Sequence, residues 1–182
     1  MSILTLDLSR NSGWAQFQEG WQKPAYGTLK LGSAKTSSIG RSNATLFKGL
    51  LDIHRVTEVK RVFVEKPYTP FKFDERTNWK TLRMQFGYVT VVQMFAHHIN
   101  IGMPVEVDPN TWRLTFLQDF KRTMKRPTLK KLAIERCQQF GWSPKNDDEA
   151  DALGLLDSVL LDRKIQTPWR TAETLQPTSE VR

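Results

Sequence analysis

The stretch Asn146-Asp147-Asp148-Glu149-Ala150-Asp151-Ala152-Leu153-Gly154 decides how the rest of this chain is interpreted. Four acids fall within five positions, and mostly apolar residues follow as far as Leu161. Acids are favoured in the first turn of a helix, because unpaired N–H groups and the positive end of the helix dipole lie there. The pattern therefore predicts a helix that begins near residue 146 and continues to about residue 161.

Helix capping accounts for only part of this stretch. Asn146 followed three residues later by Glu149 fits a capping box. Asp151 lies beyond the first turn among apolar neighbours, where a carboxylate is costly unless it has a partner. Asp148 and Asp151 share one helical face because they are spaced i, i+3, and two carboxylates on one face can bind a divalent cation. The stretch by itself leaves a metal site and a plain helix cap equally open.

The composition favours a protein that meets a polyanion. The chain has 182 residues, enough for one domain with a sizeable core, and its net charge is +8. A basic surface suits nucleic acid, and a local acid cluster suits metal ions at the phosphates of that nucleic acid. A basic surface that serves only solubility remains the alternative.

Cysteine use and hydropathy indicate a cytoplasmic protein. Cys137 is the only cysteine, so an internal disulfide is excluded and a reducing compartment, with the nucleoid, is expected. The first residues resemble no signal peptide, and no apolar run approaches the length of a membrane span, so we expect no membrane partner. We predict one domain over residues 1–163 and a loose, polar tail over residues 164–182.

Hydrophobic periodicity predicts an α/β fold. Three short strands joined by polar turns form an antiparallel meander, and two further strands alternate with helices. The expected strands are residues 2–8, 14–17, 26–31, 61–65 and 104–107, and the expected helices are residues 46–56, 77–100, 109–117, 127–140 and 146–161. Asp7 ends the first strand and Glu65 ends the fourth. A lone acid there is more often a turn residue or a solvated strand end, although sites in α/β sheets form at the carboxyl ends of strands.

Two segments are predicted to contact DNA. The loop 66–79 interleaves aromatic and basic side chains, which suits base stacking and phosphate contact, although its rings could instead fold back onto the core. A second segment, 121–131, has six cations and no acid, and this density favours phosphate binding over a merely solvated face. With Arg10, from the turn after the first strand, the predicted contacts are Arg10, Lys66, Tyr68, Phe71, Phe73, Lys121, Arg122, Lys125, Arg126, Lys130 and Lys131.

The helix expected over residues 77–100 has two apolar stripes. One contains Leu82, Phe86, Val89 and Ala96, and the other contains Met84, Tyr88, Val91 and Phe95. A helix that is apolar on more than one side is either central or shared with a partner. We therefore predict that the second stripe is a homodimer interface.

The order of strands and helices, with acids ending strands one and four and opening the last helix, resembles the RNase H-like superfamily. Within that superfamily it resembles the RuvC-type Holliday junction resolvases. The matching segments are residues 3–15, Arg41 with Leu46, Leu50 and Ile53, residues 62–65, and the D-x-x-D-A-L pattern of residues 148–153. The turn after Asp7 lacks the glycine that the family usually has before the position of Ser9. The chain therefore resembles a divergent member, of phage or mobile-element type.

This resemblance implies an RNase H-like fold and a metal-dependent junction endonuclease. The metal-binding acids of the family carry over to Asp7, Glu65, Asp148 and Asp151, and its junction-facing aromatic residue carries over to Tyr68. Two Mg²⁺ ions, or Mn²⁺ in their place, suit a site of carboxylates without Cys or His. We expect Asp7 to bridge both ions. The substrate would be four-way branched DNA, cut by paired symmetric nicks that leave a 5′-phosphate, and a C2 homodimer would supply two sites.

Three other interpretations remain open. An RNase H is disfavoured because its second acid usually opens a helix, whereas Glu65 ends a strand. A YqgF-type protein is the second, because the segment Asp74-Glu75-Arg76-Thr77 resembles the D-E-R-x-T of that branch. Here the segment precedes the long helix directly after strand four, so we take the match as coincidental. A branched-DNA-binding protein with little catalysis is disfavoured because all four acids are present.

Overall fold

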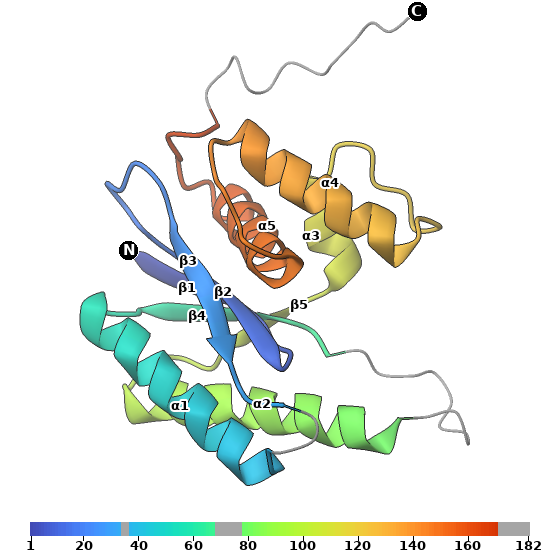
Figure 1. The fold of residues 1–182 in the computed structure, drawn as a ribbon. Coiled ribbons are helices and arrows are strands. Elements are labelled where there is room, and N and C mark those ends of the chain that lie inside the picture. Colours follow the sequence, from blue (N-terminus) through green and yellow to red (C-terminus); the bar gives the residue numbers. More distant parts are fainter. Residues whose placement is uncertain (34–36, 68–77, 171–182) are drawn as a thin grey trace, which may run out of the picture.

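The structure is a computed structural model that describes residues 1–33, 37–67 and 78–170. The elements in these residues are β1 (Ser2–Asp7), β2 (Asn11–Gln18), β3 (Ala25–Lys30), α1 (Ile39–Val56), β4 (Arg61–Glu65), α2 (Trp79–His98), β5 (Val105–Val107), α3 (Pro109–Phe116), α4 (Arg126–Gln139) and α5 (Asp147–Asp162). The strand order is β3-β2-β1-β4-β5; β2 is antiparallel to β1 and β3, whereas β1, β4 and β5 are parallel (Figure 1). The predicted α/β fold with a mixed sheet is confirmed.

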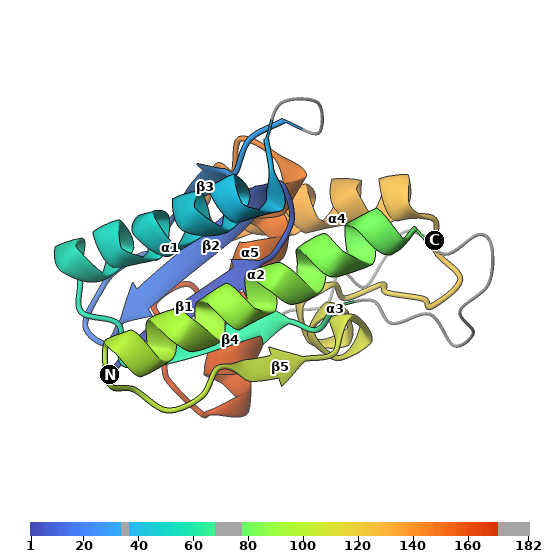
Figure 2. The same ribbon diagram turned by 90° about the horizontal axis from the view of Figure 1, so that it is seen from below.

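Helices cover both faces of the sheet and enclose two hydrophobic cores. α1 and α2 lie on one face, and α3, α4 and α5 lie on the other (Figures 1 and 2). The alternation of side chains along β1 explains the division, because Leu4 and Leu6 join the core beneath α1 and α2 while Ile3 joins the opposite core. None of the helices in the described part of the chain is long and apolar enough to cross a membrane.

The register of the central strands brings two predicted acids together. β1 and β4 run parallel, with Leu6 opposite Val64. Asp7 and Glu65 follow these residues directly, so they end adjacent strands at the same edge of the sheet. Side chains two positions apart in a strand point to the same face of the sheet. Thr5 and Phe63 point to the face that α5 covers, so Asp7 and Glu65 point toward α5 as well.

Two close contacts fix the start of α5 on the sheet. The hydroxyl of Thr5 in β1 donates a hydrogen bond to the carbonyl of Ala152 at 2.8 Å. Gly13 in β2 lies so close to α5 that an added Cβ would be 1.8 Å from the carbonyl oxygen of Asp148. A residue with a side chain at position 13 would therefore push the first turn of α5 away from the sheet.

A second glycine lets α3 approach α5. A Cβ added at Gly154 would lie 2.7 Å from ring atoms of both Trp112 and Phe116. Both rings are fully buried. This contact orients α3, which carries residues of the pocket described below.

The start of the predicted loose tail is packed, which corrects the expected boundary at residue 164. Trp169 is 7% exposed, and its ring meets that of Phe17 edge to face at 5.0 Å. Its indole N–H donates to Asp157 of α5 at 2.9 Å, and Arg170 donates to the same carboxylate. These contacts hold residues 164–170 against the core, and residues 171–182 lie outside the described part.

The predicted dimer stripe on α2 faces the interior of its own chain, so that part of the interface prediction is wrong. Tyr88, Val91 and Phe95 are all buried in the core between α2, α1 and the sheet. The apolar residues that α2 exposes are different ones, including Phe86 at 47% and Met94 at 57%. The packing of α1 decides the outcome, because periodicity alone does not show which stripe meets α1.

Candidate active site: an acidic pocket bordered by cations

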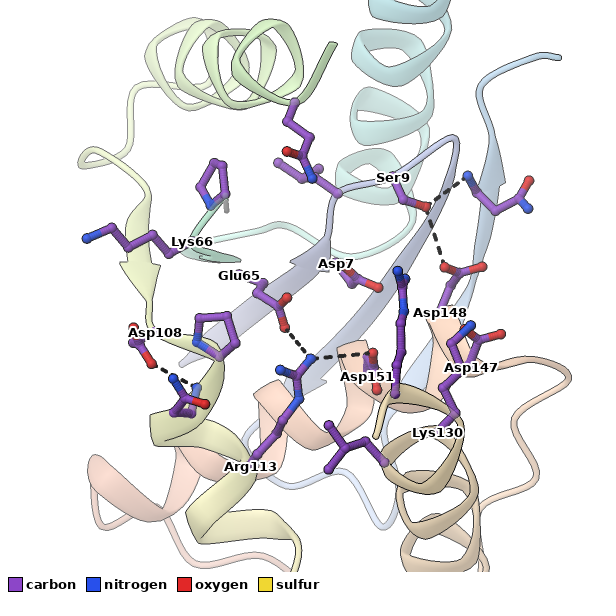
Figure 3. A pocket seen from close by; sticks show the side chains of 18 of the residues that line it. Asp7, Ser9, Glu65, Lys66, Asp108, Arg113, Lys130, Asp147, Asp148 and Asp151 are labelled. Atoms are coloured by element: carbon purple, nitrogen blue, oxygen red, sulfur yellow. Dashed lines mark hydrogen bonds and ion pairs between the residues drawn. The ribbon is translucent and has the colours of Figure 1, made fainter. Parts of the chain in front are cut away.

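All four predicted acids line one pocket of about 1100 Å³ at the carboxyl ends of β1 and β4. Figure 3 shows Asp7 and Glu65 entering from the sheet and Asp148 and Asp151 entering from α5. The structure therefore brings together acids that are up to 144 positions apart in the sequence (151 − 7). The pocket lies at the carboxyl ends of strands, where sites form in α/β sheets.

The cap of α5 orients its first turn. The side chain of Asn146 accepts a hydrogen bond from the N–H of Glu149 at 2.9 Å, as the capping-box pattern predicts. The Glu149 carboxylate is 4% exposed and does not return to Asn146; it accepts from the N–H of Lys145 at 2.8 Å and from the hydroxyl of Thr28 at 3.0 Å. Glu149 is thus a structural acid that holds the start of α5 against β3. Its neighbours Asp147 and Asp148 line the pocket, and Glu149 does not.

Glu65 and Asp151 share a cation. The Arg113 guanidinium lies 3.5 Å from Glu65 and 3.9 Å from Asp151, and all three side chains are 20% exposed (Figure 3). The indole N–H of Trp112 donates to Glu65 at 2.7 Å, and the Arg113 guanidinium lies 4.8 Å from the centre of the Trp112 ring. Two consecutive residues of α3 therefore hold Glu65 in place.

The acids at the start of α5 have different partners. Asp148 accepts a hydrogen bond from the hydroxyl of Ser9 at 3.4 Å, and Asp147 forms an ion pair with Lys130 of α4. Burial raises the pKa of Asp147, but the hydrogen bond and charge of Lys130 outweigh it and lower that pKa overall. Burial and the charge of Asp147 raise the pKa of Asp148.

The remaining acids are costly to ionise. Burial, followed by repulsion from Glu65, Asp151 and Asp148, raises the pKa of Asp7 well above its ordinary value. Burial and the charge of Glu65 raise the pKa of Asp151 to about 7, against the opposing charge of Arg113. Burial also raises the pKa of Glu65, although Arg113 and the Trp112 hydrogen bond oppose it. The pocket therefore has more carboxylates than its own cations neutralise.

The donor set suits a hard divalent cation. Carboxylate oxygens are the ligands that Mg²⁺ prefers, and a cation would offset the burial and repulsion that raise these pKa values. In the part of the chain that the structure describes, no group of three or more His, Cys, Asp and Glu residues is already arranged to hold a metal ion. Arg113 lies between two of the acids instead.

The predicted basic residues divide into two groups. Lys66, Arg126 and Lys130 line the pocket. The other described ones lie outside its lining: Arg10, Lys121, Arg122, Lys125 and Lys131. The aromatic residues Tyr68, Phe71 and Phe73, and the segment 74–77 with its YqgF-type pattern, lie outside the described residues.

Sequence reasoning missed the contribution of α3. Trp112 could be taken only as an apolar helix residue, and Arg113 stands alone rather than in a basic run. The available signal is Asp108, which caps α3 by accepting from the N–H of Asn110 directly after β5. A helix that begins at the carboxyl end of a strand next to β4 presents its first turns to the same edge as Glu65.

Comparison of this structure with solved structures identifies the fold. A Thermus thermophilus RuvC structure covers 90% of this chain and 96% of its own, with 14% identity and a TM-score of 0.64. The chain has the RuvC fold. A second structure, of T. thermophilus RuvC in complex with a Holliday junction substrate, covers 92% of this chain and 98% of its own, with 13% identity and a TM-score of 0.64. No protein-family model matches the chain, and no curated protein sequence matches it.

Proposed function

We propose that this protein is a divalent-metal-dependent endonuclease that cuts four-way DNA junctions by paired nicks. The observation that carries the proposal is the convergence of Asp7, Glu65, Asp148 and Asp151 on one pocket. Burial raises the pKa of all four acids, and repulsion from neighbouring acids adds to it at Asp7, Asp148 and Asp151; a bound cation would offset both costs. The RuvC fold, seen elsewhere in a protein bound to a Holliday junction substrate, supports the choice of branched DNA.

The four acids are the residues that would hold Mg²⁺ or Mn²⁺, in a set of two ions. When bound, such ions supply an activated water and charge stabilisation at the phosphate. Asp7 ends the central strand β1, and after burial the charges of Glu65, Asp151 and Asp148 all raise its pKa, so it would lie at the centre of the set that holds the cation. Asp7 reaches the pocket from the sheet, whereas Asp148 reaches it from α5.

The basic residues of the pocket would position DNA. Lys66, Arg126 and Lys130 line the same pocket as the acids, so a phosphate entering it would meet both kinds of charge. Positive charge binds the DNA backbone, whereas metal ions are needed to bring a phosphate against carboxylates. The exposed cations before α4, such as Lys121 and Arg122, would extend this surface.

A twofold homodimer would give one site for each of two opposed strands. The outward side of α2 is the surface that we propose for it, because Phe86 and Met94 are exposed there and lie eight positions apart on one helical face. Light scattering of Phe86→Glu should report a monomer where the wild type reports a dimer. Met103→Glu, which alters an apolar side chain 65% exposed elsewhere, is the matched control. A wild-type monomer at micromolar concentration would contradict the dimer.

Cleavage of an end-labelled synthetic four-way junction tests the function. Linear duplex, a Y-fork and an RNA–DNA hybrid serve as controls, each with and without Mg²⁺ or Mn²⁺. We expect metal-dependent nicks at symmetric positions of the junction and none in the duplex. Cutting of the hybrid alone would instead indicate an RNase H activity.

Asp7→Asn supplies the catalytic control. It removes one charge from the pocket without changing the size of the side chain, so it should abolish cleavage and retain junction binding. Cleavage at the wild-type rate by this variant would remove Asp7 from the site.

One observation favours a second candidate, a branched-DNA-binding protein with little catalysis. Arg113 already lies 3.5 Å from Glu65 and 3.9 Å from Asp151, so these two acids have a cation of the protein's own. Tight junction binding without cutting in either metal would support this candidate.

A further inference from the structure

Arg113 occupies the place between two acids where a divalent cation would neutralise them. Its guanidinium lies 3.5 Å from Glu65 and 3.9 Å from Asp151, and Figure 3 shows it between the two carboxylates. The contact to Asp151 is longer than a hydrogen bond, so Arg113 balances the charge of this acid without saturating its oxygens.

We infer that Arg113 is an internal competitor of the metal ion: it pairs with Glu65 and Asp151 in the metal-free protein and must leave them when the ion binds. This inference rests on the proposed function, because it concerns the same acids. A guanidinium and a divalent cation carry like charge, and both cannot lie between the same carboxylates without repulsion. The affinity for metal is therefore lower than the acids alone would give.

The environment of Arg113 explains how it holds this position. The guanidinium lies 4.8 Å from the centre of the Trp112 ring, a distance at which a cation is attracted to the ring face. Trp112 is itself fixed, because it is fully buried and packs over Gly154 of α5. Its indole N–H also donates to Glu65, so the ring positions both the cation and its acid.

Arg113 also has the freedom that the exchange requires. The side chain is 20% exposed and lines the open pocket, so it can leave the two acids without crossing the core. An arginine in a purely structural pair would instead be saturated by its carboxylate, as Arg170 is at Asp157 through two of its nitrogens. Arg113 is therefore placed to exchange with a cation at these two acids.

Titration with MnCl₂ tests the competition without measuring cleavage. Free Mn²⁺ is counted by electron paramagnetic resonance in the full chain, for the wild type, Arg113→Gln and Arg126→Gln. We expect roughly tenfold tighter Mn²⁺ binding in Arg113→Gln, within the usual range of coupling between sites. Arg126→Gln removes the same charge from the lining of the same pocket. Arg126 acts on Glu65, Asp147 and Asp148 through its charge, but among the described residues it forms no ion pair with them. Arg126→Gln should change the affinity by about twofold or less.

A thermal scan gives a second readout. In EDTA, Arg113→Gln leaves Glu65 and Asp151 without their shared cation, so its melting temperature should fall below that of the wild type. Saturating Mn²⁺ should then raise the melting temperature more in Arg113→Gln than in the wild type, because a ligand that binds more tightly stabilises more.

The outcomes separate this inference from the proposed function. Equal Mn²⁺ affinity in the wild type and Arg113→Gln, lost in Asp151→Asn, would overturn the competition and leave the metal site intact. No Mn²⁺ binding by either protein would overturn both. If Arg113→Gln fails to fold in EDTA, the Arg113→Lys variant tests the competition instead. Lysine stacks less well than arginine on Trp112, so the Arg113→Lys protein should also bind Mn²⁺ more tightly than the wild type.

Discussion

Asp151 and Asp157 lie on the same helix, six positions apart, yet they belong to two different kinds of buried site. Asp157 is fully buried, and it accepts from the indole N–H of Trp169 and from Nε of Arg170, both at 2.9 Å, with a second Arg170 nitrogen on its other oxygen. Asp151 is 20% exposed, and its ion-pair partner among the described residues is Arg113, at 3.9 Å. Repulsion from Glu65 adds to the effect of burial and raises the pKa of Asp151 to about 7.

The difference shows what distinguishes a structural acid from a site acid in this fold. A buried carboxylate whose oxygens are filled by the donors of its own chain holds two segments together. A buried carboxylate that its chain leaves partly unfilled destabilises the metal-free fold, and it is available to an external cation. Burial alone does not separate the two cases; the number and distance of the donors do.

The largest expected effect is on cleavage, and it tests whether Asp151 differs from Asp157 in function. Asp151→Asn should lower metal-dependent junction cleavage about a thousandfold, because losing a metal ligand costs several kcal/mol of transition-state stabilisation. Asp157→Asn, assayed well below its melting temperature, should cleave at close to the wild-type rate per folded molecule. Rates are compared under single-turnover conditions. Equal losses in the two variants would mean that the acids do not differ in kind.

The next largest effect is on stability, and it tests whether Asp157 has a structural role. Asp157→Asn should lower the free energy of unfolding by about 3 kcal/mol, because it removes the charged partner of Arg170, which is itself largely buried. Urea denaturation measures the change. Asp162→Asn, at the exposed end of the same helix, is the matched control and should change stability by less than about 0.5 kcal/mol. A similarly small change in Asp157→Asn would contradict a structural role for this cluster.

A smaller effect on stability concerns the contact between β2 and the first turn of α5. Gly13→Ala should cost about 2 kcal/mol, because its new Cβ must displace the backbone at Asp148. The displacement is at the pocket end, so Mn²⁺ affinity should fall as well. Gly40→Ala in α1, where an added Cβ meets nothing within 4 Å, is the control for the change of residue type. Unchanged Mn²⁺ binding in a destabilised Gly13→Ala protein would show that Asp148 does not depend on this contact.

The smallest effect has the opposite sign. In EDTA at pH 8, Asp151→Asn should raise the free energy of unfolding by about 1 kcal/mol, because it removes a charge that burial and Glu65 disfavour. Saturating Mg²⁺ should cancel this gain, since only the wild type keeps the ligand. Urea denaturation with and without metal checks both parts, and a loss of stability in EDTA would place Asp151 with the structural acids.

The sequence predicted the strands well because their apolar runs are short and end at turns. It also predicted four of the acids that line the pocket, because Asp7 and Glu65 end neighbouring strands, and Asp148 and Asp151 share one face of a helix. It did not predict that Asp108 and Asp147 line the pocket as well. It did not predict Arg113, because a single cation in a short helix carries no periodic signal. The burial of the α2 stripe in its own core and the packing of Trp169 were both missed. In each case the apolar pattern shows that a side chain is buried but not which surface it packs against.

The hydrogen bond from Thr5 to Ala152 joins residues 147 positions apart, and it has a consequence for synthesis. A chain emerges from its N-terminus first, so β1 and β4 can pair, with Asp7 beside Glu65, before α5 exists. Such long-range contacts also form late in folding, since a large loop must close first. A growing chain therefore carries Asp7 and Glu65 but lacks Asp148 and Asp151, and it has no complete pocket until α5 packs on β1. The time at which the pocket is complete is set by its most distant segment.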